Sequence, residues 1–443
     1  MRVSRGALST ARSGRYAMLC SAGLLAVMGG GAAAQSGEAM SINDCLEVAL
    51  EHHPSLAFAR GRRAEAGGRV RQVVGQKGIQ LDLSSSYMRY DWLPPNKKNI
   101  LGGGSTDIYS ELAASQVLTT FGRIEGAIDA ARAQELGEQE AFRRTAQNVV
   151  YQVRRAFYAA TSASQVVAYY REAEAQMERH LEIARGLVEV GKAAPLDVLR
   201  AEVQLSNVRQ ALLRARNSEA QSRMALNNAM GRDAGTDLSI VPDDVTDLTA
   251  PPDMPVDRVL RSHPEARAAY LAVVRAEADL RSAKAGNAPT ISARVSYNSE
   301  GGSDPLAVRN WNVGVVLALP LWDSGIRRGA TDQAAARLQQ AKSNLDLVKQ
   351  RIDLDVSASW LSVGESRERI ETTRKAVDQA AEALRVVQEK YRVGLGSSIE
   401  VIDAQTALTQ ARANWTQAVA DFRTAVAQWA LATGSETAEG VAK

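Results

Sequence analysis

The sequence has few cysteines and few aromatic residues, and both shortages restrict the fold. Only Cys20 and Cys45 occur in 443 residues. Cys20 falls in an N-terminal segment that we expect to be removed, so the mature chain has no intrachain disulfide. Aromatic residues make up 5% of the chain against 45% hydrophobic residues, many of them alanine. This composition favours helices packed on helices over a bulky globular interior, and we expect Cys45 to be a small buried apolar residue.

The sequence also lacks an excess of charge of one sign, and it lacks a long apolar run beyond its N-terminus. The chain has 53 basic and 50 acidic residues. Removal of the four arginines in residues 1–34 leaves 49 basic residues against 50 acidic ones, so the mature chain is nearly neutral. No basic field therefore points to nucleic acid as a partner. No run of eighteen apolar residues follows the N-terminal segment, so we predict no membrane-spanning helix, and any integral contact with lipid would need strands.

Residues 1–34 have the three parts of a secretory signal peptide. Four arginines and no acidic residue accompany an apolar run from Met18 to Met28, and small residues from Gly31 to Ala34 follow. This pattern predicts export, with cleavage after Ala34. Cys20 lies inside the apolar run and lacks the small residues that a lipoprotein cleavage site needs just before the cysteine. We therefore predict no lipid anchor.

Proline is absent from two spans of 68 residues, 123–190 and 326–393. As continuous helix, each span would be roughly 100 Å long. Each ends in a similar turn, at Gly191 and Gly394, which lie 203 positions apart. Glycine is favoured just past a helix C-terminus, and Pro195 and Ser398 suit the first positions of a following helix. The sequence therefore predicts two tandem repeats.

The remaining patterns complete the two repeats. Before each long helix, a His-Pro dipeptide interrupts a helical segment, and a hairpin of alternating apolar and polar residues follows. After the glycine turn that ends each long helix, a shorter helix runs back beside it. We expect the short helices to stack end to end beside the long ones. The predicted helices are 42–52, 55–77, 196–230, 256–262, 264–285 and 399–432, with hairpins at about 81–118 and 291–321. The repeats then span 35–230 and 256–433, joined by an irregular linker at 231–255 and followed by a polar tail at 434–443.

The hairpin segments alternate between apolar and polar residues, which is typical of half-buried strands. In the last strand, one face carries Trp311, Val313, Val315 and Leu317, and we assign this face to lipid. Four strands cannot close a barrel, because about eight are the practical minimum and every backbone polar group in lipid must be paired. An oligomer would have to supply the other strands. The alternative is a soluble hairpin packed on helices.

The combination of a signal peptide and two repeats, each with helices, a hairpin, a 68-residue helix and a glycine turn, resembles the TolC-like outer membrane efflux channel family. The resemblance covers about 41–434, and the segments that carry it are Asn43–Leu50, His53-Pro54, His263-Pro264, Leu319–Gly325, Tyr391–Gly394 and Glu400–Gln405. It implies a homotrimer with a twelve-stranded barrel in the outer membrane and a helical tunnel in the periplasm. It also implies a periplasmic adaptor and an inner-membrane pump of the RND, ABC or MFS type as partners, and a duct without enzymatic activity or cofactor.

The resemblance also implies two sets of site residues. The turns at Val190, Gly191, Val393, Gly394 and Leu395 correspond to the periplasmic tips that an adaptor grips. The side chains that close the pore near these tips correspond to Asp197, Tyr391, Glu400 and Asp403. The position of the arginine that joins this closure in the family is Gly396 here, which has no side chain to form that bridge. An alternative explanation of Glu400 and Asp403 is that acids at a helix start suit the helix dipole.

Other chemical signals are weak. Gly394–Ser398 lacks the Lys-Ser/Thr ending of a phosphate loop, and His52, His53 and His263 are explained better as His-Pro helix ends than as a metal site. We find no motif that supports an enzyme. The rival function is a periplasmic adaptor or structural coiled-coil protein, but an adaptor would have one helical hairpin and many soluble strands.

Overall fold

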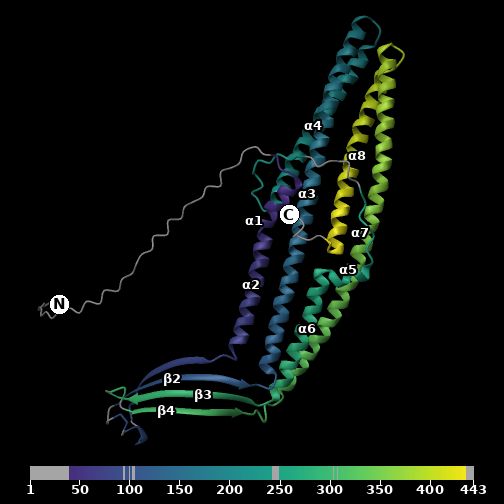
Figure 1. The fold of residues 1–443 in the computed structure, drawn as a ribbon. Helices are drawn as coiled ribbons and strands as arrows, with labels where there is room; N and C mark the ends of the chain where they lie inside the picture. Colours follow the sequence, from purple (N-terminus) through teal and green to yellow (C-terminus); the bar gives the residue numbers. More distant parts are fainter. Residues whose placement is uncertain are drawn as a thin grey trace, which may run out of the picture. The chain divides into compact units, whose positions relative to one another are not determined.

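The computed structural model describes residues 39–92, 95–98, 100–101, 105–241, 249–302, 304–306 and 308–435. The predicted signal peptide, with Cys20, and residues 436–443 of the predicted tail lie outside these ranges. The described chain is mainly helical with one small antiparallel sheet, as the sequence predicts (Figure 1). Its elements are α1 Ile42–His52, α2 Pro54–Gly75, β1 Gln80–Arg89, η1 Pro95–Lys97, β2 Thr106–Thr119, α3 Arg123–Glu189, α4 Pro195–Ala229, α5 Val256–Ser262, α6 Pro264–Lys284, η2 Ala285–Asn287, β3 Thr290–Gly301, β4 Val308–Ala318, α7 Ile326–Arg392 and α8 Ser398–Thr433.

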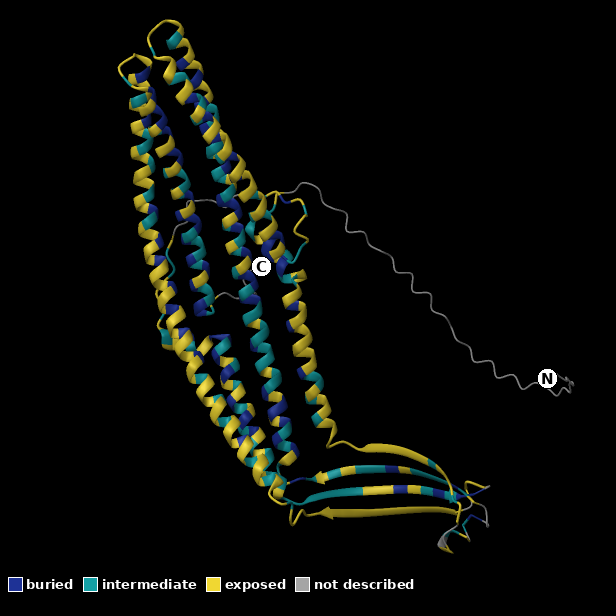
Figure 2. Ribbon diagram, turned by 180° about the vertical axis from the view of Figure 1, so that it is seen from behind, coloured by how far each residue is buried: buried dark blue, intermediate teal, exposed yellow. Residues whose placement is uncertain are grey.

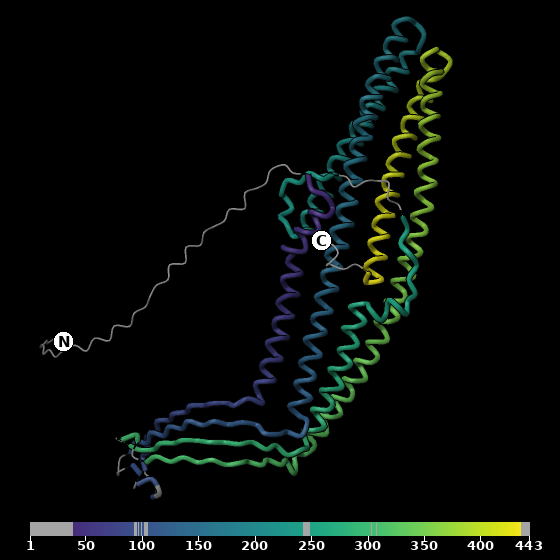
Figure 3. Tube along the Cα trace, in the orientation of Figure 1, coloured from purple at the N-terminus to yellow at the C-terminus, as the bar shows by residue number. Residues whose placement is uncertain are grey.

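The two long helices, α3 and α7, have 67 residues each and organise the helical layer. Helix α3 packs against α2 and α6 toward the sheet, and against α4 and α8 toward the far end. Helix α7 packs against α6 and then α8. The shorter helices therefore lie one above the other beside the long ones, as Figures 1 and 3 show and as the sequence predicts. No helix of the described residues is long and apolar enough to cross a membrane.

Two glycines and two His-Pro dipeptides form the joints where short helices meet end to end. Gly231 ends α4 with a φ of +76°, and a Cβ atom there would lie 2.9 Å from Pro54 Cδ. Gly434 ends α8 with a φ of +63°, and a Cβ atom there would lie 3.2 Å from Pro264 Cδ. Each His-Pro dipeptide ends one helix and begins the next, as predicted. The histidine imidazole also caps the next helix, which was not predicted: His53 Nδ1 accepts from Ser55 N, and His263 Nδ1 from Glu265 N.

Replacing Gly231 or Gly434 with alanine should destabilise the fold by about 1–3 kcal/mol, because a left-handed residue acquires a Cβ atom that also presses on the facing His-Pro dipeptide. Gly364 is the matched control. It lies exposed inside α7 with no atom near its Cβ direction, so alanine there should stabilise the helix by about 0.5–1 kcal/mol. Urea unfolding of the three variants measures the difference. Equal effects at all three sites would contradict the close packing at the joints.

The sheet has the order β1-β2-β3-β4, with every neighbouring pair antiparallel. The prediction of half-buried strands is confirmed for the central strands β2 and β3, whose residues are mostly half-buried or buried, and wrong for the outer strands, because β4 is exposed along its whole length and β1 nearly so (Figure 2). No helix among the described elements packs on either face of the sheet. The last strand also ends at Ala318, earlier than predicted, because its partner β3 begins at Thr290 and the chain reaches Pro320 two residues later.

Small side chains dominate the helix contacts, while larger residues gather in separate clusters. The cluster around α1 contains Cys45, which is fully buried. This burial raises the pKa of the Cys45 thiol to about 11. Leu238, from the predicted linker, also packs in this cluster, and Met40 pairs with Ile240 in a short parallel bridge. The described part of the linker is thus attached to the helical layer, which its irregular sequence does not show. Residues 242–248 of the linker lie outside the described residues.

Candidate functional site

The two faces of the sheet differ sharply in chemistry. On one face, the strand register forms a row of apolar residues across the sheet. Leu83 of β1 pairs with Leu112 of β2, which pairs with Tyr297 of β3, which pairs with Trp311 of β4. The predicted lipid-facing residues Trp311, Val313, Val315 and Leu317 all lie on this face, and each is at least 63% exposed. Polar residues also lie on this face; two of them, Ser85 and Ser110, form a 2.9 Å hydrogen bond with each other between their hydroxyl groups. This apolar face is continuous across all four strands.

The opposite face carries ion pairs and hydroxyl groups. Arg294 donates to Glu111 across β2 and β3 at 2.8 Å. Near the hairpin loops, Lys97 contacts Asp107 and lies 2.8 Å from Glu300 Oε1. A sheet that packed on a soluble core would bury its mainly apolar face, whereas here that face is exposed and the ion pairs lie on the other one. This polar face suits contact with water.

Both edges of the sheet are open. Strand β1 pairs only with β2, and β4 pairs only with β3, among the described residues. Each outer strand therefore presents unpaired backbone N–H and C=O groups along its free side. These edges lie at opposite ends of the same sheet, so one copy of the chain cannot pair them with each other.

The predicted tips are two matching helix-to-helix turns, which lie at the end of the helical layer opposite the sheet (Figure 3). Gly191 and Gly394 adopt left-handed φ values of +69° and +79°, as predicted. In the first turn, Gly191 N donates to Val188 O at 3.0 Å and Lys192 N donates to Leu187 O at 2.8 Å. The second turn repeats both bonds from Gly394 and Leu395. This is the Schellman arrangement, which closes the helix end without any side-chain cap.

The side chains of the tips are left free for contact. The apolar residues Val190, Val393 and Leu395 project into solvent, and Leu395 is 83% exposed. Nothing lies within 4 Å of the position that a Cβ atom would take on Gly191 or Gly394. A partner can therefore approach both turns closely. These apolar groups take no part in closing the turns, so they are candidates for contact with a partner.

The predicted pore residues fall into two groups. Tyr391 is only 6% exposed, and Asp197 is half-buried with Arg200 3.9 Å away. Glu400 and Asp403 lie on the exposed side of α8. Glu400 also caps its own helix, because its carboxylate accepts from Ser397 N at 3.4 Å. The described contacts place Asp197 near Tyr391 and leave the other two acids separate from them.

Two residues that the sequence interpretation missed lie beside Tyr391. The His180 ring, from α3, is centred 5.0 Å from the Tyr391 ring, and its Nε2 lies 2.9 Å from Ser398 Oγ. Burial lowers the pKa of His180 below its ordinary value of 6.5, and the Asp197 carboxylate opposes this shift. Burial also raises the pKa of Tyr391, and the nearby Ser398 hydroxyl opposes this shift. A lone histidine in a 67-residue helix gives no sequence signal for this contact, because it depends on how α3 meets α7 and α8.

Gly396 is explained by its backbone surroundings. A Cβ atom at this position would lie 3.0 Å from Tyr391 N and 3.1 Å from Lys390 Cβ. Any side chain here would press on the end of α7. The absence of the family arginine is therefore built into the conformation of this turn.

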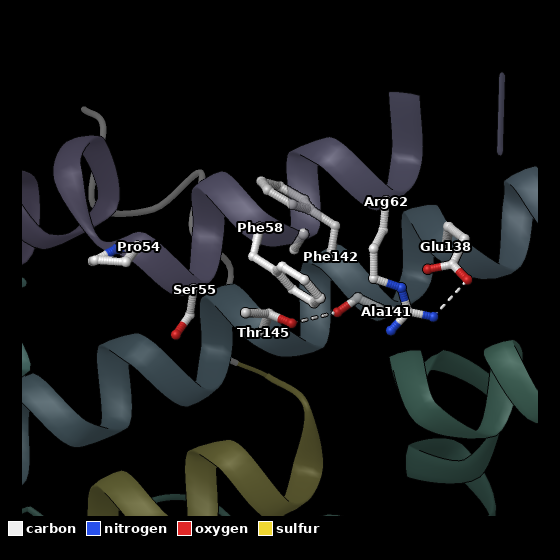
Figure 4. Close-up of a pocket in the computed structure, with 9 residues that line it drawn as sticks. Pro54, Ser55, Phe58, Arg62, Glu138, Ala141, Phe142 and Thr145 are labelled. Atoms are coloured by element: carbon white, nitrogen blue, oxygen red, sulfur yellow. Dashed lines mark hydrogen bonds and ion pairs between the residues drawn. The ribbon is translucent and has the colours of Figure 1, made fainter. Parts of the chain in front are cut away.

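A groove of ≈ 390 Å³ lies between α2 and α3, far from the tips (Figure 4). Phe58 and Phe142 line its apolar part, and Arg62 and Glu138 form a 2.8 Å ion pair at one end. The site residues predicted from the sequence do not line it. We therefore leave it out of the candidate site.

Comparison with known proteins agrees with this geometry. The family described as outer membrane efflux protein matches residues 45–232 and 256–435, which together are most of the chain. The chain therefore belongs to the outer membrane efflux protein family. Its family and fold are those of a channel, which disfavours the adaptor alternative.

Individual relatives are distant in sequence and similar in fold. Protein CyaE of Bordetella pertussis is 24% identical over 321 residues, which cover 68% of this chain and 64% of CyaE. The chain thus matches less than two thirds of that relative's length. The Campylobacter jejuni CmeC outer membrane channel superposes with a TM-score of 0.79 at 15% identity, covering 90% of this chain and 88% of CmeC. The outer membrane protein VceC of Vibrio cholerae superposes with a TM-score of 0.77 at 19% identity, covering 89% and 96%.

Proposed function

We propose that three copies of the chain close into a twelve-stranded barrel in the outer membrane and form the exit duct of a tripartite efflux or type I secretion system. The observation that carries this proposal is the open four-stranded sheet, with an apolar face, a polar face and two unpaired edges. In lipid, such edges must be paired. Because the chain contributes an even number of strands, β4 of one copy meets β1 of the next in the antiparallel sense. Two copies would give eight strands and an interior filled by side chains, whereas three leave a lumen.

In this assembly, the helical layers of the three copies would form a tunnel that extends from the barrel into the periplasm. The tips, about 100 Å from the barrel by the length of α3, would meet a periplasmic adaptor that delivers cargo from an inner-membrane pump. The exposed apolar residues of the tips support docking there, as does the closure of the ends of α3 and α7 by backbone bonds alone. The duct would select and conduct cargo without covalent chemistry.

The entrance would lie near the tips, where Glu400 and Asp403 are exposed and Asp197 is half-buried. Three copies would bring nine carboxylates to one constriction, which attracts cations. Glu400→Gln combined with Asp403→Asn should weaken cation selectivity and block by multivalent cations in planar-bilayer recordings. Glutamine also serves at the third position of a capping box, so the Glu400→Gln change leaves the helix start intact.

A matched control removes two exposed carboxylates from α1, through Glu47→Gln and Glu51→Gln. This control should leave selectivity and block unchanged, because α1 lies far from the tips (Figure 1). Unchanged selectivity and block in the α8 variant would show that its acids only start the helix, and that the constriction lies elsewhere.

A further inference from the structure

The two helical hairpins, α3–α4 and α7–α8, are joined near the tips by several polar contacts of different burial. Gln204 donates to Thr406 at 3.1 Å, and Arg412 donates to Glu172 at 2.7 Å, both on exposed surface. The contact between His180 and Ser398 is buried, with 5% and 1% of these residues exposed. Exposed contacts contribute little to the free energy that holds the hairpins together, whereas a buried one matters more.

All four helices of the tip region meet around the His180 imidazole. It projects from α3, about 14 Å below the first turn by its sequence position. Helix α7 presents the Tyr391 ring, helix α8 presents the Ser398 hydroxyl, and helix α4 presents the Asp197 carboxylate. Glu400, on α8, is engaged with its own helix start. Among the described residues, the titratable groups that act on or contact the imidazole are the Asp197 carboxylate and the Tyr391 phenol.

This contact is not a product of the internal repeat. At the offset of 203 positions, His180 corresponds to Ala383, Tyr391 to Val188 and Ser398 to Pro195. None of these three residues can reproduce the hydrogen bond or the ring contact. A buried polar contact is costly unless it is satisfied, and an apolar pair would pack here without that cost. Because the contact joins α3 of one hairpin to α8 of the other, breaking it would let the two hairpins separate.

We propose that neutral His180 is a clasp that holds the two hairpins together at the tips, and that its protonation releases them and widens the entrance. The inference rests on the proposed duct only in its last step, because hairpin separation can be measured without conduction. When the hairpins separate, water reaches the imidazole and its pKa returns toward 6.5. The closed state is therefore favoured above pH 6.5 and loses stability as the pH falls below that value.

Two measurements test the clasp. Spin labels at Lys192 and Leu395, one on each tip turn, report the distance between the hairpins in assemblies where labelled copies are diluted with unlabelled ones. Between pH 6.5 and the lower pKa of the closed state, the ratio of separated to closed hairpins should rise by up to tenfold per pH unit. Planar-bilayer conductance should rise over the same pH range, in step with the fraction of separated hairpins.

Variants separate the clasp from general packing. His180→Gln keeps a hydrogen-bonding group but cannot titrate, so its hairpins should stay together at pH 5.5. Ser398→Ala removes the partner, so separation should increase already at pH 7.5 while the pH response remains. His52→Gln, at an exposed histidine on α1, should behave like the parent chain.

The outcomes are distinct. A parent chain whose tip distance does not change with pH, or a His180→Gln variant with the full pH response, would overturn the clasp. In the second of these cases, the source of the pH response would be His53 or His263, the histidines at the joints. A tip distance that responds to pH without any conductance would support the clasp and contradict the proposed duct.

Discussion

Replacing Val315 with arginine should prevent the chain from assembling in the outer membrane. Val315 lies in the middle of β4 on the apolar face, beside Ala293, and its side chain is exposed. An arginine at the bilayer midplane of a barrel costs about 2–4 kcal/mol, and a symmetric trimer would carry three. The measurement is the amount of folded trimer in isolated outer membranes, together with its urea unfolding in lipid vesicles.

Asn312→Arg is the matched control for this change. Asn312 lies on the same strand but on the polar face, opposite Ser296. An arginine there would point into water in the proposed barrel, so trimer amounts and unfolding should match those of the parent chain. If Val315→Arg assembles normally while Asn312→Arg does not, the two faces are assigned the wrong way round.

Replacing Leu395 with aspartate should abolish export while trimers accumulate normally. Leu395 projects from the second tip turn, and its backbone N–H, not its side chain, closes the helix. The change therefore removes an apolar contact and adds a charge without disturbing the turn. Gly394→Val should also abolish export, but by straining a left-handed residue at a cost of about 1–3 kcal/mol. Cellular accumulation of dyes and metal ions measures export, and native mass measures assembly.

Tyr270→Asp controls for an acid placed on an exposed apolar position of the helical layer, because Tyr270 lies on α6, remote from the tips. It should leave export intact. Loss of trimers in Leu395→Asp would mean that the turn serves folding alone. Normal export in that variant would mean that the adaptor docks elsewhere.

The features that the sequence predicts well are those that depend on neighbouring residues. The long helices over the proline-free spans, the left-handed turn glycines Gly191 and Gly394, and the helix ends at the His-Pro dipeptides all follow from local backbone preferences, and the structure confirms them. The alternation of β4 likewise gives the apolar face correctly. Half-burial is the wrong inference for the outer strands β1 and β4, because alternation shows that two faces differ but not what covers them.

The features that the sequence does not predict depend on contacts between distant segments. His180 meets Ser398 across 218 positions, and the repeat offers no second copy of the pair. Gly231 is required by the approach of Pro54, which only the end-to-end stacking of helices reveals. The left-handed backbone at Phe121, just before Gly122, also has no sequence signal, because phenylalanine rarely adopts it.

The central claim is that β1 of one copy pairs with β4 of the next in a closed ring of three. Within one copy these strands are three strand spacings apart, about 14 Å, which is too far for a disulfide. In a Cys45→Ala background, single cysteines introduced on the polar face at Ser84 or Ser86 of β1, combined with one at Asn310 or Asn312 of β4, can therefore join only different copies. After oxidation of intact outer membranes, the account predicts that at least one pairing gives covalent dimers and trimers, and nothing larger. A ladder that continues beyond three copies, or the absence of any crosslink with all four pairings, would contradict it.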